Sequence, residues 1–420
     1  MYQKITLDNG LRLVTSQMPH TRSVCIGLFT GTGSRYETDT EAGTSHFIEH
    51  LLFKGSRKRP SPGAISADIE GVGGVLNGGT DKELTVYWCK VAQDHFPLAL
   101  DVLVDMLLHP LFDIEEMSRE RRVIIEEINM CKDSPAQEAG IIADEILWPG
   151  HPLGRDIAGS KESVNAITRE AILDYYRRHY RPDDTVAVVA GNLEHERIID
   201  AVSQAVDGWS STESTPHYTP YHPDGGLAVK IEKRDIKQAH LCLSLPGLPL
   251  LHPKRFQLDL LNVILGQGMS SRLFTEVRDR MGLAYSIHSY VEHFLDTGSL
   301  TVYAGVDTTN LATAIKAIID QMCDLREKVP EEELIRAREI SRGRLLLRME
   351  DSHNVAGWLG GQEALTGQIF TPERVTGIID AITAAEIEQL ARELIQDGCF
   401  RMAVVGPVSE GEPLEELLRL

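Results

Sequence analysis

The chain has 420 residues, of which 42% are hydrophobic and 25% are charged, and its formal net charge is −20. This composition is typical of a folded, soluble protein, and the length favours two domains of about 200 residues each. The acidity argues against nucleic acid as a partner, because phosphate binding needs clustered Lys and Arg. It is compatible with a basic peptide as partner, and equally with a role in solubility alone.

The distribution of cysteines and apolar residues indicates in which cellular compartment the protein is found. Six cysteines are scattered without a C-x-x-C pair, which is typical of a reducing environment. The first residues alternate like a strand and lack the basic and apolar regions of a signal peptide. No apolar run approaches the roughly 18 residues of a membrane span. We therefore expect a cytoplasmic protein without a membrane partner.

The first half of the chain predicts a mixture of strands and helices. Its opening segment, 5–19, alternates on both sides of Asp8-Asn9-Gly10, which predicts a β-hairpin. Further strands are predicted within 23–34 and 83–91, where β-branched and aromatic residues alternate with others. Helical periodicity marks 42–54, 62–71, 94–108, 114–131, 135–147 and 163–178.

Two similar segments indicate an internal repeat. "VAVVAGN" closes the first half and "MAVVGPV" the second, with Ala187 and Ala403 at corresponding positions, 216 residues apart. Between them, 210–226 is rich in Ser, Thr, Pro and Gly, as in a linker. A duplicated α+β unit explains this pattern. We predict a metal-binding catalytic domain over 1–209, a linker over 210–226 and a substrate-binding domain over 227–420.

"HFIEHLLFKGS" contains a candidate metal motif, H-x-x-E-H. In a helix, His46 and His50 lie one turn apart on the same face, so both can bind one ion. Neutral imidazole suits zinc, and a nearby carboxylate that does not bind the metal, here Glu49, can act as a general base. The alternative is a chance match with two core histidines, because the motif specifies only three residues.

A second segment, "RERRVIIEEINM", offers a third ligand. Glu120 and Glu127 are two helical turns apart on one face, roughly 10 Å from each other, so both cannot bind one ion. One of them should bind the metal and the other should support the ligands. The alternative is a charged amphipathic helix whose glutamates are solvated.

With these residues, the sequence resembles the pitrilysin-type inverzincin metallopeptidases. Within that family it is similar to the branch of the mitochondrial processing peptidase β subunit and its bacterial relatives. The family pattern places 76 residues between H-x-x-E-H and a glutamate, and residues 51–126 form that spacer here. The resemblance implies His46, His50 and Glu127 as zinc ligands, Glu49 as base and Glu120 as accessory acid.

The segment 73–88 resembles the family's edge strand beside the metal, to which an extended peptide adds as a further strand. The family more often has Ala at the position of Gly78, which suggests a looser approach of the backbone here. Alternatively, these glycines only make tight turns. The implied substrate-binding residues are Asn77, Gly78, Gly79 and Thr80.

The segment 268–290 resembles the part of the family that carries an arginine–tyrosine pair, here Arg278 and Tyr285. The resemblance implies that the arginine binds the peptide main chain and that the phenol stabilises the oxyanion of the reaction. Taken singly, the two residues would be read as a surface arginine and a core tyrosine.

The resemblance covers essentially the whole chain. It implies an α+β fold of two similar domains, related by pseudo-twofold symmetry and closing like a clamshell around a chamber. It also implies an endopeptidase that cleaves peptides or unfolded segments with one zinc ion per chain, although manganese or cobalt suits the same ligands. The alternative is a non-catalytic scaffold or binding subunit. Because both motif sets lie on one chain, we expect a homodimer rather than pairing with a sister subunit.

Overall fold

The computed structural model describes residues 2–211, 217–223, 225, 228–409 and 413–420. Helices and strands are mixed, and the strands form two sheets, which confirms the predicted α+β class. The chain divides into two compact units, and neither is continuous in sequence. The first unit comprises Met1–Ile128, Asp156–Thr219 and Leu346–Thr371, and the second comprises Asn129–Arg155, Pro220–Leu345 and Pro372–Leu420. The predicted linker, 210–226, lies partly outside the described residues.

The sheet of the first unit has the order β1-β2-β6-β3-β5-β4. Strands β2 and β6 are parallel, and the other neighbours are antiparallel. The predicted hairpin joins β1 to β2, and Gly10 adopts the left-handed conformation, with φ of 91°, that the turn requires. The strands are β1 (Tyr2–Thr6), β2 (Arg12–Gln17), β3 (Ser23–Thr30), β4 (Val75–Thr80), β5 (Thr85–Ala92) and β6 (Thr185–Gly191).

The sheet of the second unit repeats this topology. Its order is β7-β11-β8-β10-β9, with β7 and β11 parallel and the other neighbours antiparallel. Each of these strands corresponds, in chain order and in pairing, to one of β2 to β6. The prediction of a repeated α+β unit is therefore confirmed. The strands are β7 (Val229–Lys233), β8 (Gln238–Pro246), β9 (Ala284–His293), β10 (Gly298–Asp307) and β11 (Arg401–Gly406).

One face of the first sheet is covered by helices from the same half of the sequence, which form a large apolar core with it. The helix predicted over 163–178 is in fact two helices, α6 and α7. Ile167 between them is extended, and the Thr168 side chain accepts a hydrogen bond from the Ala171 amide and so starts a new helix. The helices are α1 (Thr44–Leu52), α2 (Pro62–Glu70), α3 (Phe96–Leu108), α4 (Ile114–Asp133), α6 (Lys161–Ala166), α7 (Arg169–His179) and α8 (His195–Ala205).

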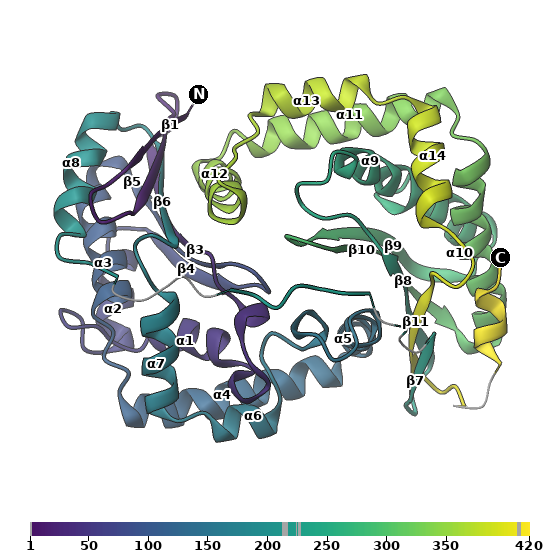
Figure 1. Ribbon diagram of the computed structural model, residues 1–420, viewed down its shortest axis with the longest axis horizontal. Helices are drawn as coiled ribbons and strands as arrows, with labels where there is room; N and C mark the ends of the chain where they lie inside the picture. Colours follow the sequence, from purple (N-terminus) through teal and green to yellow (C-terminus); the bar gives the residue numbers. More distant parts are fainter. Residues whose placement is uncertain (1, 212–216, 224, 226–227, 410–412) are drawn as a thin grey trace. The chain divides into compact units, whose positions relative to one another are not determined.

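The opposite face of each sheet is covered by a helix from the other half of the sequence (Figure 1). Helix α12 (Ser352–Thr366) packs on β3 and β6 in the first unit, where it contributes Leu359 to a core with Phe29 and Val188. Helix α5 (Pro135–Leu147) packs on the equivalent strands, β8 and β11, in the second unit. The other helices of the C-terminal half are α9 (Arg255–Gly266), α10 (Leu311–Glu327), α11 (Glu331–Arg348), α13 (Pro372–Ala381) and α14 (Ala384–Leu394).

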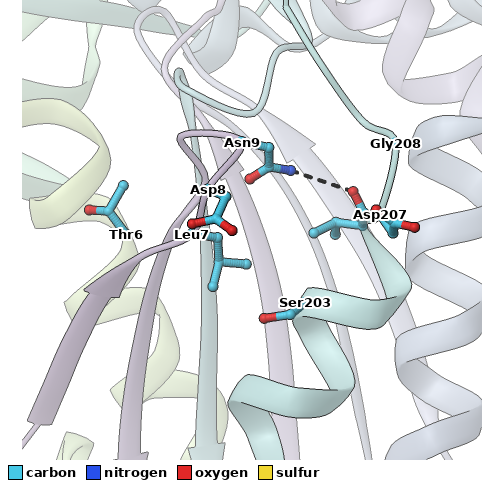
Figure 2. Close-up of a pocket in the computed structure, with 8 residues that line it drawn as sticks. Thr6, Leu7, Asp8, Asn9, Ser203, Asp207 and Gly208 are labelled. Atoms are coloured by element: carbon cyan, nitrogen blue, oxygen red, sulfur yellow. Dashed lines mark hydrogen bonds between the residues drawn. The ribbon is translucent and has the colours of Figure 1, made fainter.

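A small pocket of about 280 Å³ lies where the β1–β2 hairpin meets the end of α8 (Figure 2). The Asn9 amide donates hydrogen bonds to the carbonyls of Val206 and Trp209, at 3.4 and 3.2 Å. These bonds tie the hairpin turn to the end of the helix, so we interpret the pocket as a structural junction. None of the helices in the described ranges is both long and apolar enough to cross a bilayer.

The packing of α12 depends on two glycines that flank one aromatic ring. A Cβ atom added at Gly360 or at Gly27 would overlap the Phe29 ring. We expect Gly360→Ala to lower the free energy of unfolding by about 1–3 kcal/mol, because the ring has to move in a packed core. Gly357, in the same helix, has no atom within 4 Å of its added Cβ, so Gly357→Ala should be neutral or stabilising by up to ~1 kcal/mol. Urea unfolding measures both, and equal midpoints would contradict this packing.

His179 predicts a dependence of stability on pH. Its ring is stacked on Tyr175 at 4.0 Å and shares a hydrogen bond of 3.0 Å with Thr32. Burial, and then the charge of Arg178, lower the pKa of His179 from 6.5 to about 3. Between these values the unfolded chain binds a proton that the folded chain does not, so His179 makes the free energy of unfolding decrease as the pH falls from 6.5 to 3.

We therefore expect the free energy of unfolding of His179→Gln to decrease less steeply with falling pH than that of the wild type. The two slopes should differ by up to about 1.4 kcal/mol per pH unit. Urea unfolding across that pH range measures the two slopes. Parallel curves would show that the proton uptake of His179 does not contribute.

Candidate metal centre

Helix α1 carries both histidines of the predicted motif. Its residues Phe47, Ile48 and Leu51 are buried in the core of the first unit, and this burial determines which way the other side of the helix faces. His46 and His50 project from that side, and their rings lie edge to face with centroids 4.6 Å apart. The spacing of four residues therefore brings the two imidazoles together, as expected for a helix.

Helix α4 carries the two glutamates. Ile124 and Ile128 are buried on one stripe of this helix, and Glu120 and Glu127 belong to the same stripe, at helical spacings of three and four residues. Both carboxylates therefore face the core side of the helix, where they meet the imidazoles of α1. Glu126, the neighbour of Glu127, is exposed.

The ligand atoms of His46, His50 and Glu127 lie within 4.8 Å of one another. The Oε2 atom of Glu127 is 3.7 Å from Nε2 of His46 and 3.5 Å from Nε2 of His50. In a tetrahedral zinc site with bonds of about 2.0–2.2 Å, ligand atoms are about 3.3–3.6 Å apart. These two imidazoles and one carboxylate therefore have both the chemistry and the spacing to hold a divalent cation such as zinc.

Glu120 lies behind this cluster and holds one of its members. Its Oε2 atom is 3.0 Å from Nδ1 of His50, so His50 is oriented with its Nε2 atom toward Glu127. The Lys54 ammonium is 2.8 Å from the other Glu120 oxygen. Burial acts to raise the pKa of the Glu120 carboxyl, but the contacts with His50 and Lys54 outweigh it and lower the pKa. An ionised carboxylate there fixes the orientation of the His50 ring.

The protonation states of the other residues suit metal binding and proton transfer. Burial, and then the charge of His50, lower the pKa of His46 to about 4, so the imidazole is neutral and free to bind a metal at neutral pH. Burial raises the pKa of the Glu49 carboxyl, and Thr80 and His50 oppose this effect. A carboxyl whose pKa is raised is a better proton acceptor in the reaction than an ordinary glutamate.

The predicted substrate-binding residues lie in β4, the outer strand of the first sheet. Within the described part of the chain, no further strand pairs with the outer edge of β4. An added Cβ at Gly78 would lie 3.1 Å from the Phe53 ring and 3.2 Å from Tyr87, whereas one at Gly79 would meet nothing within 4 Å. Thr80 approaches the Glu49 carboxyl. The outer strand β4 therefore has an open edge, and its last residue, Thr80, lies beside the carboxyl expected to act as base.

Arg278 and Tyr285 lie together in the second unit. Arg278 is in a π-helical segment, Phe274–Arg280, and Tyr285 is in β9. The Arg278 guanidinium is 4.4 Å from the centroid of the Phe274 ring and 5.5 Å from that of Tyr285. Tyr285 is 80% exposed, so it is not a core tyrosine. Their roles in a reaction remain a prediction.

Lys54 was not singled out in the sequence, although a signal was present. His46, His50 and Lys54 are spaced by four residues each. Lys54 therefore continues the face of the two histidines, just beyond the end of α1. A lysine one turn after a metal motif could therefore have been expected to pair with an acidic residue near the ligands.

Comparisons with known proteins identify a family that matches most of the chain. The family model described as insulinase (peptidase family M16) matches residues 12–161, and that described as peptidase M16 inactive domain matches 166–341. The uncharacterized zinc protease YmxG of Bacillus subtilis is 35% identical over 410 residues, which cover 97% of this chain and 98% of YmxG. An uncharacterized zinc protease of Streptomyces coelicolor is 35% identical over 416 residues, covering 97% of this chain and 90% of that protein.

A solved structure of a protease from Helicobacter pylori has the same fold, with a TM-score of 0.91 at 20% sequence identity, over 97% of this chain and 99% of that one. The two family models and the relatives at 35% identity show that the chain belongs to peptidase family M16, the pitrilysin type. The resemblance to this family expected from the sequence is confirmed.

The contact between Glu120 and His50 predicts an effect on metal affinity. We expect Glu120→Gln to weaken zinc binding by roughly 10–100-fold, because the neutral amide no longer holds the His50 ring as a carboxylate does. Glu126→Gln changes the charge equally on the same helix but at an exposed position, so it should bind zinc like the wild type. Competition against a fluorescent zinc chelator measures both, and equal affinities for the two variants would contradict the assignment of Glu120.

Proposed function

We propose that this protein is a zinc-dependent endopeptidase that cleaves peptides or unfolded polypeptide segments. The observation that carries the proposal is the convergence of two imidazoles and the Glu127 carboxylate, with a further carboxyl, Glu49, beside them. We propose His46, His50 and Glu127 as the metal ligands. The relatives are named as uncharacterized zinc proteases, and these names support zinc as the metal.

In the proposed reaction, Glu49 is the general base. A divalent cation at this site supplies a positive charge that acidifies water and polarises the scissile carbonyl. Glu49 accepts the proton of the attacking water and then passes it to the leaving amine. Its raised pKa supports both steps, because the carboxyl holds the proton between them. Glu120 keeps His50 in position during the cycle.

We propose that the substrate binds as an extended strand along β4. The outer edge of β4, which pairs with no strand in the described ranges, supports this mode, since main-chain hydrogen bonds accept many sequences. The net charge of −20 favours peptides with basic residues. Arg278 and Tyr285 remain our candidates for binding the peptide main chain and stabilising the oxyanion.

A non-catalytic scaffold or binding subunit is the second candidate function, favoured by the match of residues 166–341 to a model described as an inactive domain. That match lies outside the segment with H-x-x-E-H and Glu127, which falls within the match to the other M16 model, over 12–161. The retention of a complete set of ligands and base in the first unit supports the enzyme.

The Glu49→Gln variant separates the two functions. We expect it to keep zinc, because Glu49 is not among the clustered ligand atoms, and to cleave a quenched fluorescent basic peptide at least ~100-fold more slowly than the wild type. His50→Ala should lose both zinc and cleavage. Elemental analysis and peptide hydrolysis, with and without a chelator, measure these outcomes. Cleavage by Glu49→Gln at the wild-type rate would end the assignment of the base, and an inactive, zinc-free wild type would favour the scaffold.

A further inference from the structure

Helix α1 begins without a capping side chain of its own. Its N-cap residue is Gly43, in the left-handed conformation with φ of 91°, and an added Cβ would lie 2.6 Å from the Ala158 carbonyl oxygen. Glycine is therefore required, and the usual Ser, Thr, Asp or Asn cannot supply the cap. The first amides of the helix need another acceptor.

The carboxylate of Glu37 supplies this acceptor from outside the helix. Its Oε2 atom accepts a hydrogen bond from the Gly43 amide at 2.8 Å, and its Oε1 atom accepts one from the Ser45 amide at 2.7 Å. Glu37 is only 3% exposed, so both bonds are formed by an acid within the protein. Charge-assisted bonds of this kind are stronger than those of a neutral cap, and a negative charge is favourable at a helix N-terminus.

Ser45, the residue just before His46, is fixed through its side chain as well. Its hydroxyl shares a hydrogen bond of 2.8 Å with the Tyr175 hydroxyl, and Tyr175 is fully buried. The main chain and the side chain of Ser45 are thus both held, the first by Glu37 and the second by α7. The position of the next residue, His46, follows from this anchorage.

The two histidines are held in different ways. The His50 ring is held directly, by Glu120 at Nδ1. The Nδ1 atom of His46 is buried and has no hydrogen-bond partner among the described residues. The place of the His46 ring therefore depends on packing and on the backbone of the first helical turn.

We propose that Glu37 is a positioning residue for the metal centre, which acts on His46 through the first turn of α1 as Glu120 acts on His50 directly. This inference rests on the proposed metal site. It adds a residue nine positions before the first ligand to the set that determines metal affinity and geometry.

The test compares Glu37→Gln with a matched control, Glu41→Gln. In Glu37→Gln an amide that only donates replaces one of the two acceptors, so one backbone amide loses its partner. Glu41 lies in the same loop, where its carboxylate accepts a hydrogen bond from the Thr38 amide at a neighbouring three-ten helix and pairs with Arg178 of α7. Neither of these contacts involves an amide of the first turn of α1. Zinc affinity is measured by competition with a fluorescent chelator, and the geometry by the visible absorption of the cobalt(II)-substituted proteins. Melting of the metal-free proteins reports any general loss of stability.

We expect Glu37→Gln to bind zinc roughly tenfold more weakly than the wild type and to shift the cobalt(II) absorption, because outer partners of ligands have effects of this size. Glu41→Gln should match the wild type in both, even where its melting temperature falls. If Glu37→Gln does not fold, Glu37→Asp keeps the charge on a shorter arm and should show a smaller change in the same direction.

Wild-type zinc affinity and an unchanged cobalt(II) spectrum in Glu37→Gln would overturn this inference alone. A wild type that binds no zinc, or a His50→Ala variant that binds it equally well, would overturn the proposed function and this inference with it.

Discussion

The candidate site depends on one constraint, which is that the charged faces of two helices are held at a fixed distance by their apolar faces. Phe47 and Leu51 of α1 and Ile124 and Ile128 of α4 belong to one buried core. Close-packed side chains do not slide past one another, so the imidazoles and carboxylates on the same helices keep their spacing. Binding of a cation then needs little rearrangement of the first unit.

The site also concentrates negative charge. Glu49, Glu120 and Glu127 lie within one small region, together with imidazoles of which His46 is neutral at ordinary pH. Lys54 balances the charge of Glu120 directly. A divalent cation would balance the remainder, so the same residues that repel one another without a metal favour its binding. The charge of the site is therefore a physical reason to expect a dication there rather than a neutral ligand.

The features predicted from the sequence were those with a local signal. The periodicity of α1, the H-x-x-E-H spacing and the alternating strands each lie within a short window, and the sheet topology bears out the repeat indicated by β6 and β11. The break at Thr168 was missed because a single capping threonine interrupts an otherwise continuous helical pattern. Glu37 carried no signal, because its bonds depend on how the loop before Gly43 folds back on the helix. The packing of α12 on β3 joins segments more than 300 residues apart, which no local pattern reports.

That packing has a consequence for how the protein can be made and how it could have arisen. A fragment ending before α12 would leave one side of its sheet, including Val186 and Val188, without its apolar cover, and a fragment lacking α5 would leave β8 and β11 equally bare. We therefore expect that neither half of the sequence folds alone, and that co-expressed halves assemble by each donating one helix to the other. The same arrangement would result from an ancestral dimer of single repeats whose subunits exchanged this helix and were later fused into one polypeptide.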